Sequence, residues 1–250
     1  RNWGLDYSTQ SVGRIWTDKT VSTEGIELTG ADGTITIEKS SEADFLTAFS
    51  ALSSTSNLKS TVAQPLDIVL VLDASGSMDD PMGNGDNTKR IDALKAAANS
   101  FIDEIAKQNA NISDPAQQHQ VSLVKFAGRM SNQVGNNTYY SNGYTYNYSQ
   151  VMKTMTTVDS TGATSLKSTV SSISPAGSTR ADYGLELASS QLASNGRTGA
   201  TKVVVFFTDG APTSSNGFES SVANSAVSAA KSMKDAGTTI YTVGIFSGAS

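Results

Sequence analysis

Two runs of apolar residues constrain the fold of this chain more than any other feature. The first is LDIVLVLDA at residues 66–74, and the second is TKVVVFFTDG at residues 201–210. Both have the length of a strand, and both are rich in β-branched or aromatic residues. A strand that is apolar along its length is typical of a parallel sheet whose two faces are covered by helices. We therefore expect an α/β fold.

Amphipathic segments lie between these strands and after them. Apolar positions recur at helical spacing in residues 91–105, 166–173, 185–192 and 222–233. Further strands are expected at 120–128 and 238–246, and Gly237 can end the helix that precedes the last strand. Alternating helices and strands predict a doubly wound, mostly parallel sheet of the Rossmann-like kind.

Residues 1–64 have a different pattern. The segments SVGRIWTDKTV and GIELTGADGTITIEK alternate apolar with polar residues, which is the pattern of half-buried strands, and ADG at 31–33 supplies a turn. We predict a small β region at residues 1–64 and a main domain at residues 65–250.

The composition indicates an extracellular protein. Only 16% of the residues are charged, and Ser, Thr, Asn and Gly take the surface positions that Lys and Glu usually occupy. The chain has no cysteine, which allows an extracellular location without disulfides. The net charge is -5 and no cluster of basic residues occurs, so nucleic acid is not the expected partner. No apolar stretch reaches the roughly 20 residues of a membrane helix.

Oxygen-bearing side chains follow the two apolar strands. Asp73, Ser75 and Ser77 come after the first strand, and Asp209 follows the second. Ligands of open parallel sheets bind at the carboxyl ends of the strands, so these side chains are expected to converge. Their hard oxygen atoms suit a small divalent cation such as Mg²⁺.

Three separated segments resemble the von Willebrand factor A family over about residues 66–246. DASGS at 73–77 matches its DxSxS motif, GSTRADYGL at 177–185 resembles its threonine loop, and TDG at 208–210 resembles its second aspartate segment. The resemblance implies a metal-ion-dependent adhesion site. Its ligands, direct or through water, would be Asp73, Ser75, Ser77, Thr179 and Asp209. Mg²⁺ is the expected ion, with Mn²⁺ and Ca²⁺ as alternatives.

The residue types of this set have a physical consequence. If the neutral hydroxyls coordinate directly and the aspartates act mainly through water, the ion keeps positive charge and a replaceable water. A carboxylate of a partner protein can then complete the coordination shell. The competing interpretation is that these residues cap a helix and form a turn.

A second acidic stretch, MDDPMGNGDN at 78–87, lies just beyond the first motif. Asp79, Asp80, Asn84 and Asp86 offer oxygen atoms for a further cation, but the spacing of a calcium loop is not met. A solvated loop is the favoured interpretation.

A tyrosine-rich segment follows the strand at 120–128. Residues 136–148 read NNTYYSNGYTYNY and contain five of the eight tyrosines. By the resemblance, the next strand returns antiparallel, which puts this loop at the edge that holds the cation. Tyrosine is favoured in binding surfaces. The candidate ligand contacts are Tyr139, Tyr140, Tyr144, Tyr146 and Tyr148, and a self-packed insertion is the alternative.

Lys19 lies in the segment WTDKTV. This segment resembles the first strand of immunoglobulin-like stalk domains that form lysine-to-asparagine isopeptide crosslinks in Gram-positive surface proteins. The alternative is an exposed strand lysine.

Catalysis is not expected. A serine nucleophile at Ser75 or Ser77 would need a base, and the one histidine, His119, precedes a strand and so belongs at the opposite edge of the sheet. A glycine-rich phosphate-binding loop with its lysine is also missing from the sequence.

The predicted function is that of a cell-surface or cell-wall adhesin of the Gram-positive kind. It would bind a host protein, such as an extracellular-matrix or cell-surface protein, or other pilus subunits. The alternative is a scaffold or chaperone-like assembly subunit of the same superfamily. Because family members have another helix and strand after the last one seen, we expect the native protein to continue past Ser250 and its tail to complete the amino-terminal β region.

Overall fold

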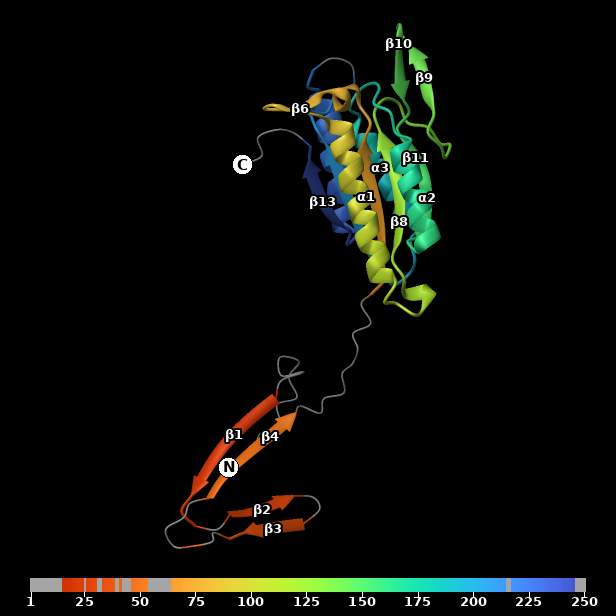
Figure 1. Ribbon diagram of the computed structural model, residues 1–250. Coiled ribbons are helices and arrows are strands. Elements are labelled where there is room, and N and C mark those ends of the chain that lie inside the picture. The colour runs from red at the N-terminus through yellow and green to blue at the C-terminus, as the bar shows by residue number, and fades with distance from the viewer. Residues whose placement is uncertain are drawn as a thin grey trace. The chain divides into compact units, whose positions relative to one another are not determined.

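The chain consists of two compact units, residues 1–62 and residues 63–250. The computed structural model describes residues 15–24, 26–30, 33–38, 41, 46–53, 64–214 and 217–245. Figure 1 shows the elements of both units. No helix in these ranges is long and apolar enough to cross a membrane.

The described residues of the first unit include four strands. Strand β1 (Ile15–Ser22) pairs antiparallel with β4 (Leu46–Ser53), and β2 (Ile26–Gly30) pairs antiparallel with β3 (Gly33–Ile37). The turn expected at 31–33 falls on residues 31 and 32, which lie outside the described ranges, before β3 begins at Gly33.

The second unit contains a five-stranded sheet in the order β11-β8-β5-β12-β13. Its strands are β5 (Leu66–Asp73), β8 (Gln120–Phe126), β11 (Gln150–Thr157), β12 (Thr201–Thr208) and β13 (Thr239–Gly244). All neighbours are parallel except β11, which runs antiparallel to β8. The chain leaves β5 toward β8 and later returns on the other side to β12. The carboxyl end of β5 is therefore a point where the winding changes direction, and such points hold ligands in α/β sheets.

Helices cover both faces of this sheet, so the predicted doubly wound fold is confirmed. One face packs against α1 (Arg90–Asn109) and α2 (Ser160–Ser171), which lie in front of the sheet in Figure 1. The other packs against α3 (Ala181–Asn195) and α4 (Ser220–Asp235). Within β5, Leu70 and Leu72 belong to the first core, whereas Val69 and Val71 belong to the second. A strand buried on both faces needs this continuous apolar sequence.

Two short hairpins differ from the loops expected in their place. The acidic stretch forms β6 (Pro81–Gly83) and β7 (Asp86–Lys89) after the 3-10 helix η2 (Gly76–Asp79), and the tyrosine-rich segment forms β9 (Thr138–Ser141) and β10 (Tyr144–Asn147). Both turns are Asn-Gly pairs with positive φ, 53° and 90° at residues 84 and 85, and 50° and 86° at residues 142 and 143. Asn-Gly between short strands is the sequence signal for a tight hairpin, and both segments contain it.

Candidate cation site

Asp73 is the last residue of β5, and its side chain is fully buried. Its Oδ1 accepts a hydrogen bond of 2.9 Å from the Ser75 amide, and its Oδ2 accepts one of 2.8 Å from the Thr208 hydroxyl. Burial raises the pKa of Asp73 to about 6, and the charge of Asp209 adds to this, while the hydrogen bonds from Ser75 and Thr208 oppose it. Two hydrogen bonds orient the carboxylate, and among the described residues it forms no ion pair with a cationic side chain.

A chain of oxygen atoms leads from this position to the neighbouring strand. The hydroxyls of Ser75 and Ser77 lie 3.1 Å apart, and Ser77 Oγ donates a 2.9 Å hydrogen bond to Asp209 Oδ1. Ser75 and Asp209 are buried. The two apolar strands therefore bring the predicted side chains together, as the topology requires.

Thr179 joins the site through the loop before α3. Its backbone forms an antiparallel bridge with Thr213, and the Gly177 carbonyl accepts a 2.9 Å hydrogen bond from the Gly76 amide. Ser77, Thr179 and Asp209 line one cavity of about 310 Å³. All five predicted residues thus lie at the carboxyl end of β5 and β12 or in the loops bound to it.

The donor set fits a small hard cation. It consists of two carboxylates and three hydroxyls, and oxygen ligands of this kind are those that Mg²⁺ takes in proteins. Within the described ranges, no three His, Asp or Glu side chains form a group that could hold a metal ion. A cation at this place would depend on the serine and threonine hydroxyls.

Arg90 is a member of this site that the sequence interpretation missed. It is the first residue of α1 and lines the same cavity. Its Nη1 donates a 2.9 Å hydrogen bond to Asp209 Oδ2, the carboxylate oxygen that Ser77 does not use. An arginine at the start of a helix gives no local signal of such a partner, because the contact depends on how α1 packs against β12.

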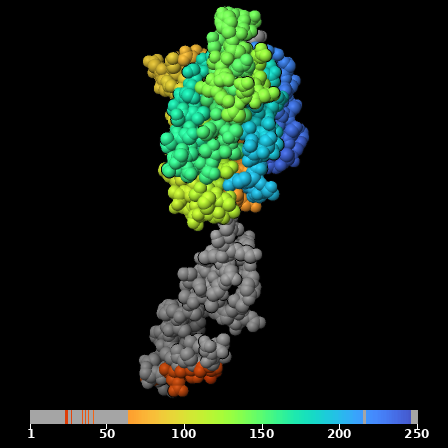
Figure 2. Space-filling view, turned by 90° about the vertical axis from the view of Figure 1, so that its right-hand side faces the viewer, coloured from red at the N-terminus to blue at the C-terminus, as the bar shows by residue number. Residues whose placement is uncertain are grey.

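The five tyrosines of the hairpin divide into two groups. Tyr140 and Tyr144 expose 74% and 70% of their surface, so they are available to a ligand. Tyr139 instead stacks on Tyr146 and packs against Tyr148, with ring centroids 5.4 Å and 4.6 Å apart. Figure 2 shows the hairpin as a green lobe that protrudes from the end of the second unit.

The base of the tyrosine hairpin is hydrogen-bonded to the loop that follows β5 and to the loop that precedes α3. The Asn147 side chain, which is buried, donates hydrogen bonds of 3.0 Å to the Ala74 carbonyl and 2.7 Å to the Ser174 carbonyl. Its Oδ1 accepts one of 2.9 Å from Nζ of the fully buried Lys125. Lys125 also donates to Asn136 Oδ1 and to the Asn137 carbonyl, at 2.6 and 3.1 Å. Burial lowers the pKa of Lys125 to about 8.

The acidic stretch does not gather its carboxylates at one point. Asp79 forms an ion pair of 2.8 Å with Lys89, Asp80 lies 3.9 Å from Arg90, and Asp86 accepts a hydrogen bond from the Thr88 amide. This distribution agrees with the favoured interpretation that the stretch is solvated.

Lys19 lies in β1 opposite Phe49 of β4. Its side chain is outside the described part of the structure, so the isopeptide crosslink stays a prediction.

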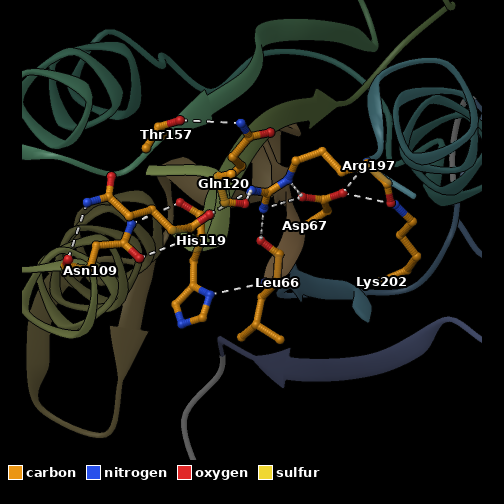
Figure 3. A network of polar contacts seen from close by, with 10 residues as sticks. Leu66, Asp67, Asn109, His119, Gln120, Thr157, Arg197 and Lys202 are labelled. Carbon is orange, nitrogen blue, oxygen red and sulfur yellow. Dashed lines mark hydrogen bonds and ion pairs between the residues drawn. The ribbon is translucent and has the colours of Figure 1, made fainter. Parts of the chain in front are cut away.

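His119 lies at the opposite end of the sheet, as its position in the sequence predicts. Its Nδ1 accepts a 3.0 Å hydrogen bond from the amide of Leu66, the first residue of β5 (Figure 3). Because β5 rises about 3.3 Å per residue, this end lies roughly 23 Å from Asp73. Burial, with the charge of Arg197, lowers the pKa of His119. The single histidine of the chain therefore cannot act as the base of Ser75 or Ser77.

The same end of the sheet holds a buried ion cluster. Asp67 is paired with Arg197 Nη2 at 2.7 Å and with Lys202 Nζ at 2.9 Å (Figure 3). Burial alone would raise the pKa of Asp67, but the hydrogen bonds from Lys202 and Arg197 outweigh it and lower the pKa. The carboxylate of this cluster is paired with two cationic side chains, whereas Asp209 at the other end of the sheet is paired with Arg90.

Comparison with protein families supports the resemblance. Residues 67–250, which are more than half of the chain, match the profile of the von Willebrand factor type A domain. No curated protein matches the chain.

Similar folds occur among solved structures of pilus proteins. The pilus adhesin SpaC from Lactobacillus rhamnosus GG is 22% identical with a TM-score of 0.51, and the match covers 72% of this chain and 24% of that one. The PilB minor pilin from Streptococcus sanguinis is 16% identical with a TM-score of 0.52, and the match covers 92% of this chain and 67% of that one. These likenesses show a common fold, and the chain spans about a quarter of the length of SpaC.

Proposed function

Because the chain belongs to the von Willebrand factor type A domain family, we propose that it is an adhesive module that binds a protein ligand through a divalent cation. The observation that carries this proposal is the row of hydrogen-bonded oxygen atoms from Ser75 through Ser77 to Asp209, of which Ser77 and Asp209 line a surface cavity. These side chains belong to two separate segments of the chain, and Thr179 of a third segment lines the same cavity as Ser77 and Asp209.

The cation would be held by the residues named from the sequence. Ser75, Ser77 and Thr179 would offer hydroxyl oxygens, and Asp73 and Asp209 would act directly or through water. When bound, the ion supplies a Lewis-acidic point that a ligand carboxylate can occupy. Mg²⁺ is the proposed ion because neutral hydroxyls and few charges suit a cation that keeps part of its water shell, with Mn²⁺ or Ca²⁺ as alternatives.

The chain's own residues would orient the ligand around that point. The exposed rings of Tyr140 and Tyr144 stand on a hairpin whose base is bonded to the Ala74 and Ser174 carbonyls. Large aromatic side chains with few rotatable bonds contribute contact area at low entropic cost. They are the proposed contacts of a protein surface that reaches the cation.

We further propose that the protein acts outside the cell, as part of a Gram-positive pilus or cell wall. The low charge content and the lack of cysteine support this location, and two proteins of similar fold are a pilus adhesin and a minor pilin. Its ligand would be an extracellular-matrix or cell-surface protein, with other pilus subunits as further partners. Residues 1–64 would belong to a stalk domain, in which Lys19 is the candidate for a crosslink.

A binding role is favoured over catalysis because the only histidine lies at the far end of the sheet. The second candidate is a scaffold or chaperone-like assembly subunit that uses the same cation site. The tyrosine hairpin favours the adhesin, because two solvent-exposed aromatic side chains on a hairpin bonded to the loops of the site suit an external ligand.

The test is binding to a panel of matrix and cell-surface proteins in Mg²⁺ and in EDTA. Asp73→Ala and Thr179→Ala should lose binding in Mg²⁺, and wild type should lose it in EDTA. Asp103→Ala is the matched control, because Asp103 is exposed on α1 and lies about 20 Å along the helix from Arg90. Binding that persists in EDTA and in both site variants would contradict the proposal.

A further inference from the structure

Arg90 places a positive charge inside the cavity that would hold the cation. Its guanidinium lies 2.9 Å from Asp209 Oδ2, and its backbone amide donates a 3.0 Å hydrogen bond to the Asp80 carbonyl, which fixes the start of α1. The Arg90 side chain keeps 24% of its surface exposed, whereas that of Asp209 is fully buried. Its Nε is buried and has no hydrogen-bond partner within the described residues.

Because Arg90 binds Asp209, the two carboxylate oxygens of Asp209 have different partners. Oδ1 accepts the hydrogen bond from Ser77 and faces the hydroxyl row, while Oδ2 is occupied by Arg90. Asp209 therefore offers a single oxygen toward the site, and part of its negative charge is already balanced.

The charge balance of the site depends on this arginine. The hydroxyl donors are neutral, so Asp73, Asp209 and Arg90 together carry one negative charge. Asp80 lies 3.9 Å from Arg90, but its side chain is 64% exposed and does not line the cavity. A divalent cation would change this to one positive charge, whereas without Arg90 the loaded site would be neutral. A net positive site binds an added cation less strongly and attracts an anion more strongly.

We propose that Arg90 sets the selectivity of the site, weakening the affinity for the cation and strengthening the affinity of the loaded site for a carboxylate over a neutral oxygen ligand. This inference rests on the proposed function. A guanidinium has five N–H donors. Within the described residues Arg90 uses one of them, on Nη1, to bond Asp209, and its Nε is buried, so the donors that remain for a ligand are on Nη1 and Nη2. One oxygen of a ligand carboxylate can bind the cation while the other accepts a hydrogen bond from Arg90.

The first test measures cation affinity without any ligand, by titrating Mn²⁺ and following water proton relaxation. Arg90→Gln should bind Mn²⁺ about tenfold more tightly than wild type, in the usual range of electrostatic coupling between sites. Arg90→Lys keeps the charge and should stay close to wild type. Lys89→Gln is the matched control, because it removes one positive charge from the neighbouring residue, which pairs with Asp79 and not with Asp209.

The second test adds acetate or neutral acetamide to the Mn²⁺-loaded proteins. Acetate should displace bound water from wild type at several-fold lower concentration than from Arg90→Gln, while acetamide should not distinguish the two. Circular dichroism and thermal unfolding verify that each variant is folded.

The outcomes separate this inference from the proposed function. If wild type shows no saturable Mn²⁺ binding, both fail. If wild type binds Mn²⁺ and folded Arg90→Gln binds it equally or more weakly, only the role of Arg90 is overturned, because the arginine then serves to orient Asp209. Equal acetate affinities in wild type and Arg90→Gln overturn the selectivity for carboxylates.

Discussion

The hydroxyl of Ser77 donates a 2.9 Å hydrogen bond to Asp209 Oδ1 across 132 positions of the sequence. The contact exists because β5 and β12 are adjacent and parallel, with Leu72 opposite Phe207. Both strands end at the same level, so the loops that follow them meet. The following predictions depend on this meeting point and on the hairpin attached to it.

Cation binding should stabilise the wild-type protein against unfolding, and Asp73→Asn should remove this stabilisation. Wild type should gain about 2.7 kcal/mol of unfolding free energy when Mg²⁺ is present at a hundred times its dissociation constant. Asp73→Asn should lose this gain. In EDTA at pH 7 the variant should be at least as stable as wild type, because burial raises the pKa of Asp73 to about 6 and so disfavours the charged carboxylate.

Urea unfolding in Mg²⁺ and in EDTA measures both effects. Asp103→Asn makes the same chemical change at an exposed position of α1, where Asp103 pairs only with Lys167, and should leave the Mg²⁺ effect intact. Equal stabilisation of wild type and Asp73→Asn by Mg²⁺ would contradict the prediction.

Lys125 should make the stability of the protein depend on alkaline pH. Its pKa is about 8 in the folded chain and 10.5 when unperturbed, so between these values the unfolded chain binds more protons. Stability from this group therefore rises with pH in that window, by about 2 kcal/mol between pH 7.5 and 9.5. The measurement is the difference in unfolding free energy between wild type and Lys125→Met, which cancels the titration of other groups.

The same variant should cost stability through the acceptors that it leaves behind. Lys125→Met removes the donor of three oxygen atoms, of which only Asn147 Oδ1 belongs to a buried residue, and an unsatisfied buried acceptor costs about 1–3 kcal/mol. A difference between wild type and Lys125→Met that does not change from pH 7.5 to 9.5 would refute the pH dependence.

Gly177 should not tolerate a side chain. Its φ is +103°, and an added Cβ would lie 2.7 Å from Cδ1 of Tyr146 in the hairpin. Gly177→Ala should cost about 2–4 kcal/mol and weaken cation binding, because this residue belongs to the loop that carries Thr179. Gly143→Ala is the matched control, since φ is +86° there but nothing lies within 4 Å, and it should cost only about 1 kcal/mol.

A second substitution tests the steric part of this argument. Tyr146→Ala should reduce the penalty of Gly177→Ala, because the clashing ring is gone. An unchanged penalty would assign the whole effect to the backbone conformation.

The exposed tyrosines should affect ligand binding without affecting stability. Tyr140→Ala and Tyr144→Ala should each lower the affinity for the ligand found in the protein panel about tenfold or more, as expected of aromatic contact residues. Tyr241→Ala is the control, because Tyr241 is 59% exposed on β13 and outside the hairpin. Tyr139→Phe should instead cost about 1 kcal/mol of stability, because the Tyr139 hydroxyl accepts a hydrogen bond from the Arg129 amide. Full affinity in both exposed-tyrosine variants would exclude these rings from the interface.

Much of this protein is determined by local sequence. The apolar run of β5 predicts a strand buried on both faces, and the spacing of Ile91, Leu94 and Ala98 predicts the buried face of α1. Such periodicity indicates which side chains of a segment are buried and whether the segment is a helix or a strand. Both can be inferred from the segment alone, without knowing which other segments pack against it. The positions of Asp73 and Asp209 were predictable for the same reason, because Asp73 is the last residue of β5 and Asp209 directly follows β12. The Asn-Gly turns at 142 and 143 were local signals as well.

The tertiary structure decided which distant side chains meet. Arg90 reaches Asp209, and Asn147 joins Lys125 to the Ala74 carbonyl, through contacts that depend on strand order and helix packing. The division of the tyrosines into the stacked Tyr139 and the exposed Tyr140 follows from alternation along a strand, but only once a hairpin exists and one of its faces is covered. A residue's type and spacing limit what it can bind, whereas the packing of the whole sheet determines which partner comes within hydrogen-bonding distance.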